Sequence, residues 1–360
     1  MSGKLRELGS DSRPAMSISP IIAKDISLYR QFFSRDGRAS CYGNSWTYIT
    51  QACRGLGLGY KYYDGDVLLS IGRHNGHYVI VRPLGTIDHR FLDLLRFLAR
   101  ASYRPVFVKK LFPDQVATLR HLGDFCPASA YAGDREQAVP GKYVWDGGAF
   151  ADDDTYPELI YDIDLSSALE LERSQWLAAY RLARADTPGT FHGHSPSRYH
   201  YELRRRVRQF SNLSIHCRLE EYHAGMEDGV RQFCADYFGV SRRENAAAYE
   251  NMLKLPQVTD CENRFFRFVA FVGGSSVPSG FFVVERLDRL SAGSYASIIS
   301  RRYPGLPEYL TTRVMQQLKG AGVRYLNVGG SESHGLHMFK KKYGPIEART
   351  MAMLVYGTRS

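Results

Sequence analysis

Apolar and polar positions along the chain follow two periods, one typical of strands and one typical of amphipathic helices. The apolar runs GDVLLSIG at 65–72 and HYVIVRP at 77–83 flank the turn signal Asn75-Gly76 and predict a β-hairpin. At 90–100, apolar residues recur instead at the spacing of one helix face. A hairpin followed by a helix is therefore expected in the first half of the chain.

The second half of the chain repeats this order of elements. Strands at 265–272 and 280–285 are joined by the turn GGSSVPS, and a strand at 293–300 and a helix at 308–320 follow. Identity between the halves is too low for a sequence repeat. The shared order nevertheless predicts an α/β (α+β) fold of two units, each a mixed sheet flanked by helices and superposable on the other.

A polar segment with Gly and Pro, TPGTFHGHSPS at 187–197, predicts a linker between these units. The first twenty residues are polar and contain several Ser and Pro, which favours a loose leader. The expected division is a leader over 1–20, a first unit over 21–186 and a second unit over 198–360.

The composition is typical of a globular, water-soluble protein. Of the 360 residues 44% are hydrophobic and 23% are charged, and the mean hydropathy is −0.32. No run approaches the roughly 18 apolar residues that cross a bilayer, and no signal peptide opens the chain, so a cytoplasmic protein without a membrane span is expected. Six scattered cysteines form no C-x-x-C pair, which predicts reduced thiols and no metal site.

The charge is basic and unevenly distributed. Lys and Arg number 47 against 37 Asp and Glu, a net charge of +10, and residues 301–360 hold ten Lys/Arg against three Glu. A basic segment of this kind can attract a polyanion such as RNA or a phosphorylated cofactor. A solvated basic face without a partner is the alternative.

The most distinctive stretch is YLNVGGSESHGLHMFKKKYGP at 325–345. A short apolar strand ends at two adjacent glycines, whose small size lets a ligand approach the backbone, although a plain strand-to-helix turn has the same sequence. Polar residues and then a helix with three lysines follow, which favours a site. The candidate substrate-binding residues are Asn327, Gly329, Gly330, Ser331 and Ser333.

This pattern, G-G-S-E-x-x-G-L-x-x-F-K-x-K-Y-G-P, resembles the C-terminal half of tandem GNAT-fold aminoacyl-tRNA-dependent transferases. These include the catalytic domain of phosphatidylglycerol lysyltransferases, the Fem-type peptidyltransferases and the valanimycin-type seryl transferase. The resemblance is strong over 265–356 and weaker, by element order, over 40–125. It implies two tandem GNAT-like domains that move an aminoacyl group from aminoacyl-tRNA to an amine or hydroxyl. The acceptor would be a small molecule, the setting natural-product biosynthesis, and no cofactor besides the aminoacyl-tRNA co-substrate would be needed.

The resemblance also implies roles for particular residues. The Fem-type Phe-Lys pair falls on Phe339 and Lys340, whose ammonium would neutralise charge on the tetrahedral intermediate. Glu332 is a candidate for orienting or deprotonating the acceptor amine, although a carboxylate at a helix N-terminus is the simpler interpretation.

An arginine-rich helix in these enzymes matches YHYELRRRVRQF at 199–210. On a helical wheel Arg204, Arg205 and Arg208 face away from the apolar stripe, as a surface for tRNA phosphates would. A solvated basic face gives the same pattern. The candidate tRNA-binding residues are Arg204, Arg205, Arg208, Lys341 and Lys342.

One departure from acetyl-CoA enzymes bears on the donor. Their Q/R-x-x-G-x-G/A loop, whose amides hold the pyrophosphate, corresponds to RYPGLP at 302–307. Pro304 and Pro307 have no N–H to donate. An acyl-CoA-dependent N-acyltransferase is therefore the second hypothesis, and a non-catalytic RNA-binding protein the third; the amino acid, the acceptor and the oligomeric state are not predicted.

Overall fold

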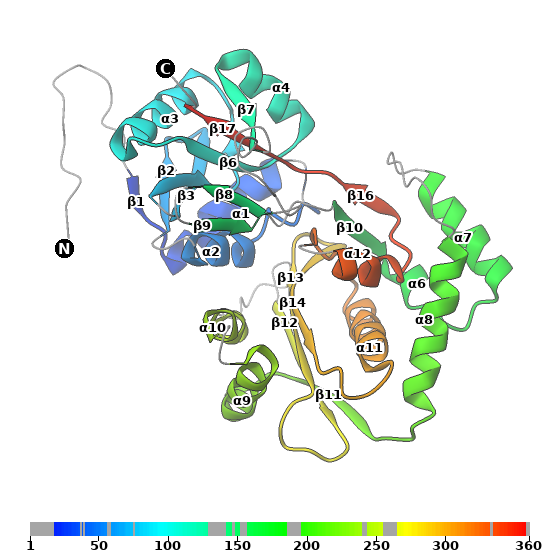
Figure 1. The fold of residues 1–360 in the computed structure, drawn as a ribbon. Coiled ribbons are helices and arrows are strands. Elements are labelled where there is room, and N and C mark those ends of the chain that lie inside the picture. Colours follow the sequence, from blue (N-terminus) through cyan, green and yellow to red (C-terminus); the bar gives the residue numbers. More distant parts are fainter. Residues whose placement is uncertain are drawn as a thin grey trace.

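Two mixed sheets form two lobes, one above the other in Figure 1. The computed structural model describes residues 18–36, 38, 40–55, 59–74, 76–128, 142–145, 148–151, 157–185, 196–239, 243–254, 265–331 and 334–357. A separate two-stranded ribbon, β8 (Lys142–Trp145) with β9 (Gly148–Ala151), belongs to neither sheet.

The first sheet has the order β1-β2-β3-β4-β6-β17-β7, with β5 paired to β3. Among the strand pairs of this sheet that the structure describes, β4–β6 is parallel and the others are antiparallel. Its strands are β1 (Ile18–Pro20), β2 (Tyr60–Tyr63), β3 (Val67–His74), β4 (His77–Ile80), β5 (Leu84–Gly85), β6 (Val106–Leu111), β7 (Phe125–Pro127) and β17 (Ala352–Tyr356). The predicted β-hairpin is present as β3 and β4, joined so that His74 pairs with His77.

Helices cover both faces of this sheet. They are η1 (Ala23–Asp25), α1 (Ile26–Arg35), α2 (Trp46–Gly55), α3 (His89–Ser102) and α4 (Pro113–Leu122). The predicted helix at 90–100 is α3: Asp88 caps its first turn through its carboxylate, and its apolar stripe packs with α4 on one side of the sheet. Helices α1 and α2 pack on the opposite side.

The second sheet has the order β11-β12-β13-β14-β15-β10-β16. Its strands are β11 (Cys217–Glu221), β12 (Phe265–Val272), β13 (Gly280–Arg286), β14 (Ser291–Ile299), β15 (Tyr325–Asn327), β10 (Glu158–Asp162) and β16 (Glu347–Arg349). Helices α8 and α11 pack against one face, and α9 and α10 against the other. The helices of this lobe are α6 (Ile163–Ser166), α7 (Arg173–Ala185), α8 (Pro196–Ser211), η2 (Ala224–Met226), α9 (Glu227–Phe238), α10 (Arg243–Leu253), α11 (Leu306–Gly320) and α12 (His334–Lys341).

The sheets do not follow the predicted division of the chain at 187–197. Strand β10 precedes that boundary but lies in the second sheet between β15 and β16, and β17, the last strand of the chain, lies in the first sheet between β6 and β7. Each sheet is thus completed by a strand from the other half. Alternation of apolar residues identifies a strand but not its partner, which is why the sequence predicted two separate halves.

The predicted leader and linker are also shorter than expected where the structure describes them. Residues 18–20 form β1 and pair with β2, and residues 1–17 lie outside the described residues. Helix α8 already begins at Pro196, and 187–195 lie outside the described residues. In the described residues no helix is long and apolar enough to span a bilayer.

A buried carboxylate joins the two lobes. Glu285 of β13 is 5% exposed, and its two oxygens accept hydrogen bonds from the backbone N–H groups of Trp46 (3.0 Å) and Thr47 (2.8 Å). These N–H groups belong to the first turn of α2, where no intrahelical acceptor exists. Burial raises the pKa of Glu285, and the hydrogen bonds from α2 oppose that shift.

We expect Glu285→Ala to lower the free energy of unfolding by about 3 kcal/mol, because it leaves two buried N–H groups without an acceptor. Glu285 binds its proton more tightly in the folded protein, so wild-type stability falls as the pH rises through the raised pKa, and the variant lacks this component. Urea denaturation at several pH values measures both effects.

A matched control is Glu220→Ala, which removes a partly exposed carboxylate paired with the exposed Arg218 on β11 of the same sheet. Exposed ion pairs contribute less than about 1 kcal/mol. Equal losses in the two variants would show that Glu285 does not hold α2.

Candidate functional site

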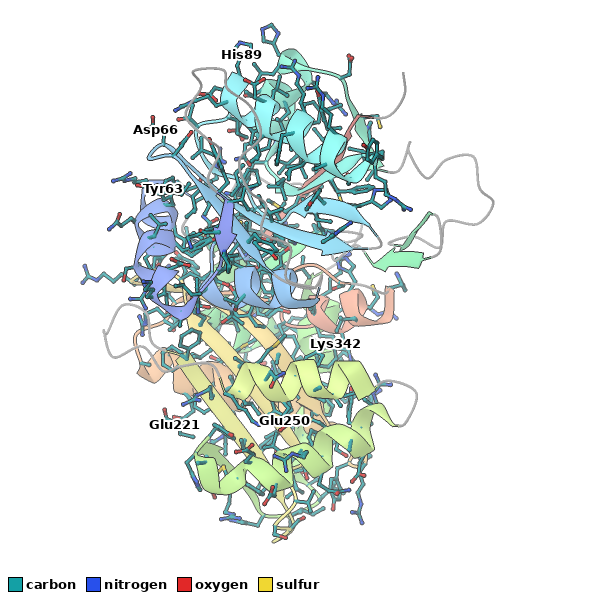
Figure 2. The ribbon with its side chains drawn as sticks, turned by 90° about the vertical axis from the view of Figure 1, so that its left-hand side faces the viewer. Tyr63, Asp66, His89, Glu221, Glu250 and Lys342 are labelled. Carbon is teal, nitrogen blue, oxygen red and sulfur yellow. The ribbon has the colours of Figure 1, made fainter. Side chains whose placement is uncertain are left out.

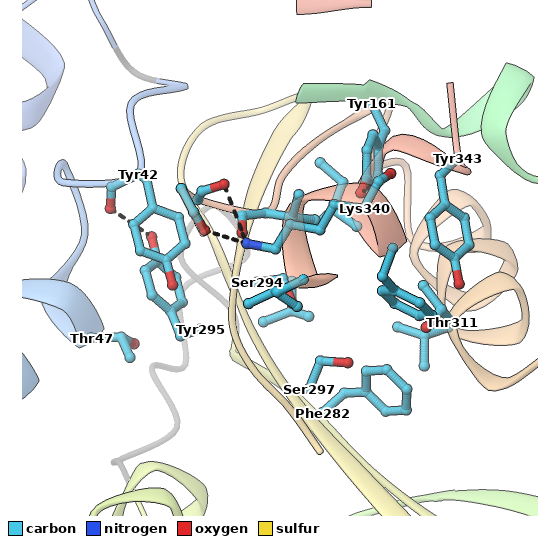
Figure 3. A pocket seen from close by; sticks show the side chains of 18 of the residues that line it. Tyr42, Thr47, Tyr161, Phe282, Ser294, Tyr295, Ser297, Thr311, Lys340 and Tyr343 are labelled. Carbon is cyan, nitrogen blue, oxygen red and sulfur yellow. Dashed lines mark hydrogen bonds between the residues drawn. The ribbon is translucent and has the colours of Figure 1, made fainter. Parts of the chain in front are cut away.

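A cavity of about 330 Å³ lies where β14 and β15 separate. The two strands pair in parallel only from Ser291 with Tyr325 to Gly293 with Asn327, and side chains from β13, β14, α11 and α12 line the space beyond. Tyr42, Thr47 and Tyr48 of the first lobe also line it (Figure 3). A pocket of this volume suits a small molecule or one end of a larger ligand.

A β-bulge shapes one wall of the pocket. Val283 pairs with Ala296 and Val284 with Ser294, so Tyr295 is the extra residue between them. Its ring lies 4.5 Å from the ring of Tyr42, and its hydroxyl donates to the carbonyl oxygen of Tyr42 (3.0 Å). The bulge thereby aims Tyr295 at the other lobe, as bulges beside binding sites often do.

Hydroxyl groups and aromatic rings make up much of the lining. Ser294 and Ser297 lie on the sheet side of the pocket, with Thr311 of α11 and Tyr343 on the opposite side (Figure 3). Burial raises the pKa of Tyr343 well above its usual value, so its hydroxyl stays protonated. These groups can accept or donate hydrogen bonds without adding charge.

Lys340 supplies the charge: among the described residues that line the pocket, it is the one charged side chain. Its Nζ donates hydrogen bonds to the carbonyl oxygens of Val328 (2.6 Å), Gly330, and Gly329 at the longer distance of 3.4 Å (Figure 3). The Tyr161 hydroxyl in turn donates to the carbonyl oxygen of Lys340 (2.8 Å), which ties α12 to β10. A fixed ammonium at the wall of a largely apolar pocket can stabilise negative charge on a bound ligand.

Phe339 precedes Lys340 and also lines the pocket. Its ring meets that of Tyr343 edge to face, with centroids 5.6 Å apart, and it packs against the core of the second lobe. The Phe-Lys pair therefore contributes one apolar surface and one charge to the same pocket.

The two glycines at 329 and 330 both line the pocket, and their predicted role in substrate binding stays a prediction. Gly329 has φ +65°, and a Cβ there would lie 2.9 Å from the ring of Tyr42. Its N–H donates to the side-chain oxygen of Asn327 (2.9 Å). Both the backbone conformation and the close ring require glycine at this position.

Asn327 does not contact the pocket, contrary to its prediction as a substrate-binding residue. It is 1% exposed, and its Nδ2 donates to the carbonyl oxygen of Ser40 (2.8 Å) and to Glu158 (2.9 Å). Ser331 is fully buried and is not among the lining residues. Glu332 and Ser333 lie outside the described residues, so their predicted roles stay predictions.

The predicted basic face is reduced by internal contacts. Arg204 donates to the carbonyl oxygen of Leu171 (3.0 Å) and is partly buried, so it packs α8 against the segment before α7. Arg205 and Arg208 are exposed, and Arg205 pairs with Glu202 (2.7 Å). That pairing holds the pKa of Glu202 at about 2.

The two lysines after Lys340 differ in their surroundings. Lys342, at the level of the lobe junction in Figure 2, pairs with Glu308 (2.8 Å) and lies over the ring of Phe339. Lys341 is partly buried. Lys342 is thus engaged inside the second lobe rather than presented to a polyanion.

The turn that would hold a CoA pyrophosphate packs against another helix. Gly305 has φ +79°, and a Cβ there would lie 2.0 Å from the backbone oxygen of Arg206 in α8. The N–H of Leu306, at the start of α11, donates to the carbonyl oxygen of Tyr303 (3.2 Å). Close packing of α8 on this turn adds to the loss of donors at the two prolines.

Sequence reasoning missed the contribution of the first lobe. Nothing in the sequence pattern linked Tyr42, Thr47 or Tyr48 to Lys340, some 300 positions later. In the part of the chain that the structure describes, no three His, Cys, Asp or Glu side chains gather in a way that could hold a metal ion.

We expect Gly329→Ala to destabilise the protein by about 2–3 kcal/mol, since left-handed backbone costs alanine about 1 kcal/mol and the Tyr42 ring must also move. Gly322→Ala is the control: its φ is +80°, and nothing lies within 4 Å of the added Cβ. Thermal and urea unfolding of both variants separates the two costs. Equal destabilisation would mean that Tyr42 does not press on the turn.

Comparison with known proteins places this architecture among solved folds. No protein-family model matches the sequence, and no curated protein matches it by sequence. A conserved protein of unknown function from Bacteroides thetaiotaomicron VPI-5482 is similar in structure, with a TM-score of 0.62, 12% identity, and coverage of 94% of this chain and 99% of its own.

Two further solved structures have names that bear on the fold. L-PGS from Bacillus licheniformis has a TM-score of 0.56 and 14% identity, and covers 95% of this chain and 94% of its own. FemX has a TM-score of 0.50 and 12% identity, with coverage of 95% and 98%. These likenesses extend over nearly the whole of each chain, and the expected fold of two mixed sheets flanked by helices is confirmed.

Proposed function

We propose that this protein is an aminoacyl-tRNA-dependent transferase that moves an aminoacyl group to an amine or hydroxyl of a small molecule. The observation that carries the proposal is the Lys340 ammonium, held at the wall of a pocket between diverging strands. The fold shared with L-PGS and FemX and the resemblance of the 325–345 motif support the same reaction class.

The chemistry needs little beyond placement and charge stabilisation. Aminoacyl-tRNA is an activated ester, so the acceptor nitrogen or oxygen attacks the ester carbonyl and negative charge develops on its oxygen. A new bond forms from the acceptor to the carbonyl carbon, the ester bond to the ribose oxygen breaks, and the proton lost by the acceptor ends on that ribose hydroxyl. Lys340 stabilises the oxyanion between these events.

The hydrogen bonds of Lys340 are compatible with this role. An ammonium has three protons, and two of its three carbonyl contacts are short, whereas the one to Gly329 is 3.4 Å. A substrate oxygen can replace this weakest contact while the two others keep the ammonium in place. Lys340 then stabilises the substrate oxygen most strongly when negative charge develops on it, which is what lowers the barrier to the reaction.

The acyl-CoA alternative is weaker on structural grounds. The turn at 302–307 has two prolines, and its glycine packs under α8, so few backbone amides there can face a pyrophosphate. We therefore place aminoacyl-tRNA as the donor and co-substrate. A small-molecule acceptor in natural-product biosynthesis and a cytoplasmic setting complete the proposal.

We expect Lys340→Ala to lower the rate of transfer about a hundredfold, because removal of one charge contact from a water-poor site costs on the order of 3 kcal/mol. Binding of tRNA should be nearly unchanged. Lys341→Ala is the control, since it removes a neighbouring positive charge that does not line the pocket. The assay follows release of labelled amino acid from a pool of charged tRNAs with mixed amine acceptors.

Three outcomes of this assay separate the hypotheses. Similar, small losses in Lys340→Ala and Lys341→Ala would remove the catalytic role of Lys340. Turnover with acetyl-CoA but not with charged tRNA would favour the N-acyltransferase. Binding of charged and uncharged tRNA without any transfer would favour a non-catalytic RNA-binding protein.

The tRNA face reduces to the exposed part of α8. We expect Arg208→Ala to lower the slope of log affinity for tRNA against log salt by roughly one unit, because one fewer phosphate contact releases fewer counterions. We expect Arg205→Ala to lower the slope as well. Glu202 still pairs with Arg206 in this variant but loses one of its two positive neighbours, which weakens tRNA binding further.

Arg231→Ala is the matched control for both, since Arg231 is exposed on α9 and likewise pairs with acidic neighbours. Filter binding at several salt concentrations gives the slopes. If α8 is only solvated surface, all three variants will keep the wild-type slope.

A further inference from the structure

A chain of buried polar groups leads from the first sheet to the pocket. Glu158 of β10 is 1% exposed, and its Oε2 accepts from Asn327 Nδ2 (2.9 Å) and from the N–H of Tyr42 (3.3 Å). Its Oε1 accepts from Nζ of Lys110 (3.4 Å), a fully buried lysine on β6 of the first sheet. Burying a carboxylate and an ammonium removes both charges from water at a high cost in free energy. Their mutual attraction and their hydrogen bonds offset this cost.

Asn327 links Glu158 to the glycine turn by hydrogen bonds on both sides of its amide. With Nδ2 directed to Glu158, its side-chain oxygen is free to accept from the N–H of Gly329 (2.9 Å). The nitrogen and the oxygen of an asparagine amide point in opposite directions. When Nδ2 donates to Glu158, it is therefore the oxygen that faces the N–H of Gly329. The identity of Glu158 thereby orients the amide at the turn.

The turn in turn holds Lys340. Strand β10 secures the backbone on one side, because the N–H of Leu159 donates to the carbonyl oxygen of Gly329 (3.3 Å) and the N–H of Val328 donates to the oxygen of Leu159 (3.0 Å). The carbonyl oxygens of Val328, Gly329 and Gly330 then accept from Nζ of Lys340. A rotation of the Gly329 peptide would move these acceptors away from the ammonium.

We propose that Glu158 and Asn327 are positioning residues for Lys340, and that Lys110 supplies the counter-charge that keeps Glu158 able to act in this way. The ammonium then reaches its place at the pocket only when β6 of the first sheet meets β10 and β15 of the second. The catalytic meaning of this arrangement rests on the proposed function, whereas the positioning is a property of the folded protein and can be measured without a substrate.

The first test uses the side-chain ammonium signals of 15N-lysine-labelled protein. An ammonium bound by carbonyls exchanges its protons slowly and gives a resolved signal, which Lys340→Arg assigns by removing it. Asn327→Asp takes away the Nδ2 donors and places a second carboxylate beside Glu158. We expect the Lys340 signal to broaden beyond detection in this variant.

The chain offers a matched control in Asn44→Asp. Asn44 is also 1% exposed, its Nδ2 donates to Asp36 (2.8 Å) and its side-chain oxygen accepts from Arg82 (3.0 Å). The same chemical change is thus made beside another carboxylate, Asp36, whose side chain is 10% exposed. Among the described contacts, this cluster has no hydrogen bond to Gly329 or Lys340. The Lys340 signal should survive in Asn44→Asp at a comparable loss of thermal stability.

A second pair of variants separates positioning from packing. Glu158→Ala removes the acceptor, whereas the double variant Lys110→Met with Glu158→Gln removes both charges and keeps an amide oxygen for Asn327. We expect the Lys340 signal to be lost in the first and retained in the second. This pair also carries the test if Asn327→Asp does not fold.

Survival of the signal in both Asn327→Asp and Glu158→Ala would overturn the proposal, as would its loss in Asn44→Asp or in the double variant. Transfer kinetics are read separately: Asn327→Asp should lower kcat at least tenfold with little change in KM for charged tRNA. Absence of transfer in the wild type, with the expected ammonium signals, would refute the proposed function and leave the positioning chain intact.

Discussion

The structure depends on how the segment at 40–48 is held against the second sheet by two buried carboxylates. Glu158 and Glu285 stand on different strands, β10 and β13, yet both accept backbone N–H groups from this one segment. Each carboxylate has left water, which is expensive unless every oxygen finds a donor. Because the donors come from the other lobe, both carboxylates would lose these hydrogen bonds if the lobes separated. This cost keeps the segment in place, and with it the pocket wall formed by Tyr42 and Thr47.

The pocket itself follows from the parallel pairing of β14 and β15. Parallel neighbours need a crossover, here α11, and the three residues that pair are too few to keep the strands together further along. Beyond Asn327 the backbone of this segment is no longer paired with β14, and buried carbonyl groups there must find donors elsewhere. Lys340 provides them. The same contact that satisfies the backbone places a charge at the cavity, so fold and site share one interaction.

The parts of the fold and of the site that depend on neighbouring residues in the sequence could be predicted. The hairpin at β3 and β4, the helix α3 and the glycine turn with its Phe-Lys pair all have patterns that short stretches of sequence determine. The partners of β10 and β17, in contrast, are chosen by pairing over some 170 and 240 positions, which no local period encodes. Asn327 looked like a ligand because it precedes the glycines, but its pairing with Glu158 turned it inward.

The net charge of the chain was a poor guide to how basic its surface is, because many of the cations are engaged within the protein. Arg82 and Lys110 are fully buried with carboxylate partners, Lys342 is paired with Glu308, and Arg204 packs on a backbone carbonyl. The three cations paired with carboxylates are neutralised within the protein, and Arg204 is held against the backbone, so these side chains contribute little to counterion release when a polyanion approaches. A chain with a net charge of +10 can therefore present a small basic face. On α8 the exposed arginines among the described residues are Arg198, Arg205 and Arg208, on the same side of the helix as the exposed ring of Tyr201.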